Sequence, residues 1–462
     1  MIPSAVSKTI ENNGGASTTA VDVTQLTLVD PEQAPKDKMV KMVLMHDVLG
    51  RMQVILPANC LLDVDTLNTR LGRDLVALAP DDLDSLRAKY SLSSIPALPG
   101  ITGLPAVVDE AVLSMDVVFL ESGEQGKMIQ FEQKVFADLL ADAREESFAV
   151  PIASIDLNRG DTSQDLEQIH DAIKKFTYLR IQQRLEDTLE VPPLPQTAQK
   201  IIHLRVDPEA GINDLADIVE SDPSLSAQVV SWASSSFYSA PGKIKSVHDA
   251  IMRVLGFDLV MNLSMGLALG RTLQLPKEQP EGYEPYWEQS MWMATATGAL
   301  INMIPREHRP GFGLAYLSGL LHNFGYLVLA HVFPPHFSLM CRYIEANPHL
   351  DSAYVEHFLL GITREQVGSK LMAVWNMPEE VIVALRHQKN SSFDGVNSDF
   401  ANILFVARNL LSASGLWVGP TQPIPAELYE RLQLDPEKAQ EAIDELIASK
   451  DEILKMAGML EE

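Results

Sequence analysis

The chain has 462 residues and a formal net charge of −26, from 36 Lys and Arg against 62 Asp and Glu. This length exceeds what one hydrophobic core holds, so two or three domains are expected. The acidic balance gives no bulk attraction for a nucleic-acid backbone, so no DNA partner is expected.

Cysteine usage and the N-terminus indicate the compartment. Cys60 and Cys341 lie far apart in the sequence, which argues against a disulfide framework and fits a reducing cytosol. We expect no apolar run to approach the length of a membrane span. Residues 1–20 lack the charged start and apolar core of a signal peptide. These observations predict a cytoplasmic protein with no membrane partner.

The first part of the chain predicts a tail and then an α/β domain. Residues 1–36 are rich in Ser, Thr, Asn, Gly and Pro and predict a disordered tail. Short alternating apolar runs flank Asp47–Arg51 and predict a β-hairpin. Further patterns predict helices over 65–71 and 81–90 and strands over 74–79, 106–109, 117–120 and 127–131. We therefore expect a compact domain with a mixed sheet over 37–142.

Ordered motifs in this region point to a known family. Leu56-Pro57-Ala58, Leu71-Gly72-Arg73, the run from Leu104 to Asp109 and the Gly123/Gly126 turn together resemble the YbaK-like aminoacyl-tRNA deacylase domain. The resemblance implies that Lys41, on the first strand, is the catalytic residue beside the substrate. It also implies that loops carrying Ser94, Pro96, Gly123 and Gly126 bind the substrate and present backbone N–H groups to its ester carbonyl.

The chain departs from this family at one loop. The family's Gly-x-x-x-Pro loop corresponds to Ser93–Pro96 and its surroundings, where the glycine is missing. A solvent-facing strand lysine is the alternative interpretation of Lys41. We therefore expect any deacylase activity to be weak and to depend on Lys41.

A connector over 143–190 follows. Leu166, Ile169, Ile173 and Phe176 fall at helical spacing with charges between them. This pattern predicts a linker helix, which either packs one stripe against a neighbouring domain or a second subunit or is solvated.

The second half predicts an all-α domain over 191–395 and a helical extension over 396–462. Five segments carry a second resemblance: Pro192-Pro193-Leu194-Pro195, Ile218 to Ser226, Ser246 to Gly256, Leu317 to Leu329 and Gln366 to Pro378. Together they resemble the HDOD domain, a helical relative of the HD metal-dependent phosphohydrolases. The order YbaK-like then HDOD is itself a known arrangement.

The resemblance places a degenerate HD metal site at Gln289, His322, Asn323, Arg364 and His387. Only two imidazoles remain there, and Asn323 supplies no anionic oxygen for a metal-bound water. Arg364 adds a positive charge where a cation would lie. We therefore expect no metal and no cofactor. We expect His322 to be a core histidine whose ring N–H bonds to a backbone carbonyl, with Asn323 or His387 as a further partner across the site.

These observations favour a regulatory, signal-transducing protein of bacterial type. The HDOD domain would be an interaction module for an unidentified signalling protein. The YbaK-like domain would sense a ligand or aminoacyl-tRNA, so tRNA stays open as a partner. Two alternatives remain at this point: an editing hydrolase that deacylates mischarged tRNA, and a metal-dependent phosphohydrolase.

Overall fold

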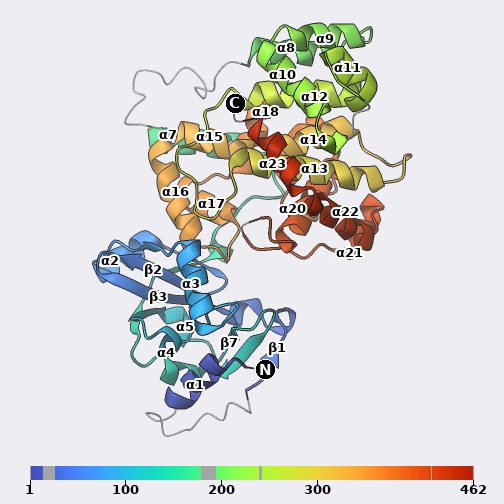
Figure 1. Ribbon diagram of the computed structural model, residues 1–462. Helices are drawn as coiled ribbons and strands as arrows, with labels where there is room; N and C mark the ends of the chain where they lie inside the picture. Colours follow the sequence, from blue (N-terminus) through green and yellow to red (C-terminus); the bar gives the residue numbers. More distant parts are fainter. Residues whose placement is uncertain (1, 14–25, 178–193, 239–241, 418, 461–462) are drawn as a thin grey trace. The chain divides into compact units, whose positions relative to one another are not determined.

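The computed structural model describes residues 2–13, 26–177, 194–238, 242–417 and 419–460 (Figure 1). The chain divides into two compact units. The first comprises residues 1–156, 279–282 and 338–358, and the second comprises the remainder. The expected order of an α/β region followed by a helical region is confirmed. Residues 338–358, far along the sequence, nevertheless belong to the first unit.

The expected hairpin forms the centre of the first unit. Strands β2 (Val40–Asp47) and β3 (Gly50–Pro57) pair antiparallel through a turn at residues 48–49, and Gly50, which follows the turn, has a positive φ of 125° that suits glycine. The five-stranded sheet has the order β5-β2-β3-β6-β9. Its β6 (Ala106–Asp109) pairs parallel with β3, and β5 (Val76–Ala77) pairs antiparallel with β2. The expected mixed sheet is therefore confirmed.

A three-stranded sheet lies beside it. Its order is β1-β8-β7, from β1 (Leu28–Val29), β8 (Met128–Glu132) and β7 (Val117–Glu121). A parallel bridge between Met39 and Phe119 joins the start of β2 to β7. The remaining elements of this region are β4 (Cys60–Leu62), α2 (Val64–Leu71), α3 (Pro80–Tyr90), α4 (Pro99–Thr102), α5 (Glu110–Leu113), α6 (Gln133–Leu139), β9 (Arg144–Glu146) and β10 (Ala149–Pro151).

Two expectations about the flanks of this domain are wrong. Within the tail predicted over 1–36, the described residues include helix α1 (Ser4–Asn13), and its Val6 and Ile10 are fully buried in the core. Two apolar residues four positions apart suffice to anchor one helix face, although the composition around them is polar. The linker predicted from 143 begins with β9, which pairs with β6, and β10, which pairs with β4, so these residues extend the first domain.

The described residues from 194 onward contain helices and no strand, as expected. The helices are α8 (Gln196–Arg205), α9 (Ile212–Glu220), α10 (Pro223–Ala233), α11 (Val247–Ala250) with a π-helical turn (Ile251–Leu255), α12 (Phe257–Gly270), α13 (Tyr286–Met303), α14 (Phe312–Leu321), α15 (Phe324–Val332), α16 (Pro334–Ala346), α17 (Ser352–Leu360), α18 (Arg364–Val374), α19 (Glu379–His387), α20 (Ser398–Ala413), α21 (Ala426–Leu432), α22 (Pro436–Ala448) and α23 (Lys450–Gly458). The motif at 192–193 lies outside the described residues.

Helices α14 and α15 form an apolar core element. Residues 312–332 are long and apolar enough to span a membrane by length and composition, contrary to the expectation that no run approaches that length. Of their most apolar window, 89% is buried inside the protein. Close packing explains the glycines here: a Cβ on Gly325 would lie 1.9 Å from the Arg364 carbonyl oxygen, and one on Gly319 would lie 2.7 Å from Ala294 Cα.

The predicted linker helix is α7 (Asp165–Thr177), and residues 178–190 of that prediction lie outside the described residues. Its Ile169 is 1% exposed, and Phe176 packs edge-on against Phe333, with ring centroids 6.3 Å apart. Leu166 is 45% exposed. Part of the apolar stripe is therefore buried, and α7 packs within the second unit.

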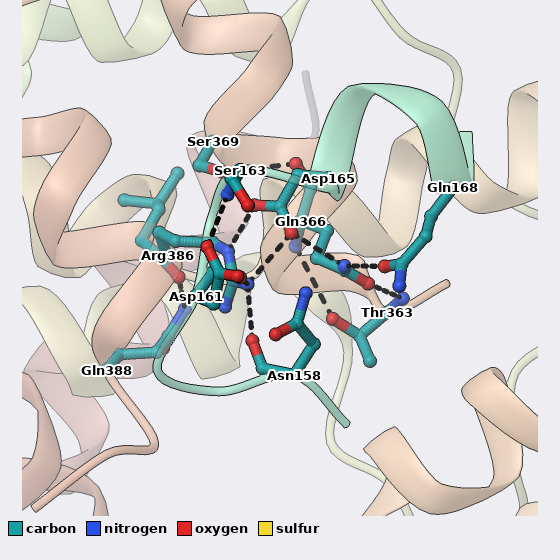
Figure 2. A network of polar contacts seen from close by, with 11 residues as sticks. Asn158, Asp161, Ser163, Asp165, Gln168, Thr363, Gln366, Ser369, Arg386 and Gln388 are labelled. Carbon is teal, nitrogen blue, oxygen red and sulfur yellow. Dashed lines mark hydrogen bonds and ion pairs between the residues drawn. The ribbon is translucent and has the colours of Figure 1, made fainter. Parts of the chain in front are cut away.

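A buried ion pair fixes the first turn of α7 (Figure 2). Arg386 on α19 donates to Asp165 from Nε at 2.5 Å and from Nη2 at 2.9 Å, and Nη2 also donates to the Asn158 carbonyl at 2.8 Å. Gln366 on α18 donates to the same carboxylate at 2.7 Å. Both residues are buried. Helix α7 is therefore tied at one point to the neighbouring helices α18 and α19, which follow it by 201 and 221 positions at these contacts.

Candidate functional site

The strand register brings Lys41 and Glu121 together in the first unit. Met39 and Phe119 are bridged in parallel, and Lys41 and Glu121 each follow two residues later. Side chains two residues apart on a strand lie on the same face. Lys41 Nζ and the Glu121 carboxylate accordingly form an ion pair, with side chains 32% and 36% exposed.

This ion pair lines a cavity of about 280 Å³. The polar side chains in its wall are Lys41, Arg87, Ser94, Glu121, Glu345 and His349. Apolar residues such as Met42, Leu78 and Ile95 supply the rest of the wall. The cavity lies wholly within the first unit.

The cavity keeps Glu121 charged. Burial opposes ionisation of this carboxyl, but the positive charge and hydrogen bond of Lys41, with a further hydrogen bond from the Ser94 hydroxyl, hold its pKa below its usual range. Arg87 pairs with Asp84 at 2.9 Å on α3. The wall therefore presents positive and negative groups side by side, and it can bind a ligand that carries both a donor and an acceptor.

The structure brings together only some of the residues predicted for this site. Ser94 lines the cavity with Lys41, whereas Pro96 is buried and does not line the cavity. Gly123 and Gly126 lie in the β7–β8 turn with φ of 85° and 69°. The Gly123 carbonyl accepts bonds from the backbone N–H and the hydroxyl of Ser93, both at 2.9 Å. The two glycines therefore shape the loop and lie outside the cavity wall.

Four residues of the wall were missed by sequence reasoning. Glu121 directly follows the strand predicted over 117–120, which in the structure extends to include it, and Arg87 lies on a predicted helix, so their positions offered a weak signal. Glu345 and His349 come from the end of α16 and the turn before α17. No local pattern links them to a cavity whose other residues lie more than two hundred positions earlier.

The five degenerate HD positions lie in the second unit, where the Asn323 amide and the Arg364 guanidinium stand at positions of metal ligands in HD relatives. Asn323 donates to the Gln289 side-chain oxygen at 3.4 Å, and its own oxygen accepts from Arg364 Nη1 at 2.9 Å. The Arg364 guanidinium also lies 4.9 Å from the Tyr326 ring centroid. Both ends of the Asn323 amide are thus bonded to side chains.

His322 bonds in part as expected. Its Nδ1 donates to the Gly319 carbonyl at 2.8 Å, which confirms the expected bond to a backbone carbonyl. The other expected partner, Asn323, bonds instead to Gln289 and Arg364. A backbone carbonyl one helix turn back is the nearer acceptor for a ring buried between α14 and α15. Burial, and then the positive charges of Arg408, Arg364 and Lys389, lower the pKa of His322 to about 3. His387 instead stacks on Phe393, with ring centroids 3.8 Å apart.

These residues do not suit a metal ion. In the part of the chain that the structure describes, no three His, Cys, Asp or Glu side chains are grouped to hold one. A cation beside His322 would meet positive charges from Arg364, Arg408 and Lys389. The donor set of an HD phosphohydrolase therefore does not fit these five positions.

Comparison with known proteins identifies two families along the chain. The aminoacyl-tRNA editing domain family matches residues 18–139, and the HDOD domain family matches residues 191–391. A candidate signal transduction protein from Marinobacter aquaeolei VT8 is 50% identical, with all of both chains covered and a TM-score of 0.91. An HDOD domain protein from Geobacter sulfurreducens is 19% identical, with 64% of this chain and 98% of its own covered and a TM-score of 0.48.

A more distant relative is an uncharacterized protein of Treponema pallidum (strain Nichols). It is 24% identical over 219 residues, which make up 46% of this chain. The match spans 39% of the length of that relative. With 50% identity over the whole of both chains, this chain belongs to the same family as the Marinobacter protein, and it contains an aminoacyl-tRNA editing (YbaK-like) domain followed by an HDOD domain.

Proposed function

We propose that this chain is a cytoplasmic regulatory protein that senses an aminoacyl ligand in its first unit and contacts a signalling protein through its HDOD domain. The observation that carries this proposal is the cavity of about 280 Å³ with the Lys41–Glu121 pair in its wall. Its volume is close to the lower end of small-molecule sites, about 300–1,000 Å³.

The chemistry of the wall favours an α-aminoacyl group. Lys41 offers a donor for a carbonyl oxygen, and the Glu121 carboxylate offers an acceptor for an ammonium group. The apolar residues around them suit a small side chain. An amino acid ester or amide carries both a carbonyl oxygen and an ammonium group on one molecule.

The HDOD domain is proposed to act without hydrolysis. The Asn323–Arg364 pair supports this, because the Arg364 guanidinium brings a positive charge to the place where a catalytic metal ion would need an anionic ligand. A fold persists after its chemistry is lost. The signal transduction description of the Marinobacter relative supports an interaction role for the helical domain.

Calorimetric titration with a set of α-amino acid amides, stable analogues of aminoacyl esters, tests the proposal. We expect at least one amide to bind the wild type. Lys41→Met should weaken the affinity for that amide about 10- to 100-fold, since a hydrogen bond to a charged group contributes about 1.5–3 kcal/mol. Circular dichroism verifies that the variant folds.

Lys38→Met is the matched control. Lys38 also has a side chain 32% exposed and an ion pair, with Asp116, but it does not line the cavity. It should bind like the wild type. Failure of every amide to bind the wild type, or equal affinity in Lys41→Met, would overturn the sensing role.

An editing hydrolase is the second candidate. The Ser94 hydroxyl and Lys41 both contact Glu121 in the same cavity, which favours polar chemistry on a bound ester. Multiple turnover on mischarged tRNA distinguishes this candidate from a sensor.

A further inference from the structure

The wall of the ligand cavity includes a segment from outside the editing domain. Residues 338–358 lie within the HDOD match at 191–391, yet they belong to the first compact unit. They comprise the later turns of α16, the connecting turn and most of α17. Glu345, Pro348 and His349 of this segment line the cavity.

Buried hydrogen bonds hold the segment against β4. Asn347, only 2% exposed, accepts from the Leu62 N–H at 2.6 Å and donates to the Leu62 carbonyl at 3.1 Å, so one amide satisfies both backbone groups. The Tyr343 hydroxyl donates to Asp63 at 2.8 Å and accepts from the Asp65 N–H at 3.0 Å. These four hydrogen bonds hold this part of the cavity wall in a defined position.

His349 is held in the same way. Its Nε2 donates to the Cys60 carbonyl at 3.0 Å. Burial, and then the positive charge of Lys41, lower the pKa of His349 to about 4. The ring is therefore neutral at physiological pH, and it lines the same cavity as Lys41 and Glu121. A neutral ring that lines the cavity and is held by the Cys60 carbonyl limits the space for a ligand side chain.

We propose that segment 338–358 is the specificity wall of the ligand cavity and that His349 sets the size of ligand side chain that the cavity accepts. This inference rests on the proposed sensing function. The ligand class is an α-aminoacyl group with a small side chain. The segment contains parts of α16, which begins at Pro334, and of α17, which ends at Leu360, so a ligand that contacts the segment contacts helices of the HDOD match.

The experiment compares the affinities of small and large α-amino acid amides for wild type, His349→Ala and His349→Gln. In His349→Ala the affinity ratio should shift toward larger apolar amides by about 10-fold or more, as expected for one to a few methylene groups of new space. His349→Gln retains volume and a donor for the Cys60 carbonyl, so it should keep the wild-type ranking.

His357→Ala is the matched control, because His357 lies on the same segment and does not line the cavity. It should also keep the wild-type ranking. A folded His349→Ala with unchanged ranking, while the wild type binds an amide, overturns this inference alone. No binding to the wild type overturns the sensing function and this inference together.

Hydrogen exchange of the wild type gives a second readout that needs no variant. A bound amide should slow exchange in residues 338–358 as well as in β2. Slowing confined to β2 and the 92–97 loop would overturn the inference even if His349→Ala fails to fold.

Discussion

Replacing Arg386 by Met should destabilise the helical unit strongly. Arg386 makes two hydrogen bonds to Asp165, at 2.5 and 2.9 Å, and one to the Asn158 carbonyl at 2.8 Å. The two side chains are 6% and 11% exposed. Methionine keeps much of the volume but leaves the Asp165 carboxylate buried beside Gln366 alone.

The magnitude follows from this burial. Removal of one partner of a buried ion pair costs about 3–5 kcal/mol, because the remaining charge has neither water nor counter-charge. The double variant Asp165→Leu with Arg386→Met removes both charges, and it should recover most of that loss, because apolar replacement of a whole buried ion pair is often neutral in stability. Recovery of most of the loss identifies the unpaired charge as the main cost.

Tryptophan fluorescence during urea unfolding measures this unit selectively. All five tryptophans, at 232, 287, 292, 375 and 417, lie in the second unit. Separate reporting matters because a chain with two units need not unfold in one step. Asp84→Ala, which breaks the exposed Arg87–Asp84 pair of the first unit, is the control and should cost about 1 kcal/mol or less when followed by far-UV circular dichroism.

The ion-pair argument would be refuted by a loss below about 1 kcal/mol in Arg386→Met. It would also be refuted by a double variant that is no more stable than the single one. Either result would mean that α7 is held by its apolar contacts, such as Phe176 on Phe333, and not by the ion pair.

Three further predictions concern the core around His322. Gly325→Ala should cost about 3 kcal/mol or more in the same urea assay, because its Cβ would overlap the Arg364 carbonyl, whereas Gly458→Ala, which faces open space, should not destabilise. The pKa of His322 in the folded chain, about 3, is below its ordinary value, so the unfolded chain binds the proton first and the free energy of unfolding falls as pH falls. Between about pH 7.5 and pH 5, His322 should account for about 2 kcal/mol of that fall. The variant His322→Gln should abolish this contribution. Purified protein should contain no stoichiometric Fe, Mn or Zn because of Asn323 and Arg364, and elemental analysis with about one metal per chain, lost in His322→Ala, would contradict this.

Local patterns predicted the elements because their causes are local. Alternation gave the β2–β3 hairpin, and helical period gave the all-α second half. Helix α1 was missed because two apolar residues, Val6 and Ile10, anchor it in the core within a polar stretch that resembles a tail. Composition averages over a segment, whereas burial of two side chains is enough to order it.

The candidate site was predicted only in part, because much of it is non-local. The family resemblance located Lys41, but its partner Glu121 depends on the bridge between Met39 and Phe119. His349 bonds to Cys60, 289 positions earlier. The Arg386–Asp165 pair spans 221 positions. No periodicity reports contacts of such separation, and only the folded chain brings these residues together.

The sensing role is tested most directly by multiple-turnover deacylation of a panel of mischarged tRNAs. The chain is incubated with excess substrate, and free amino acid is measured above the spontaneous hydrolysis of the ester. A sensor with the Lys41–Glu121 pair and no family glycine near Ser93 should bind the aminoacyl group yet release less than one equivalent per chain. Sustained turnover in the wild type that disappears in Lys41→Met and persists in Lys38→Met would contradict it and establish an editing hydrolase.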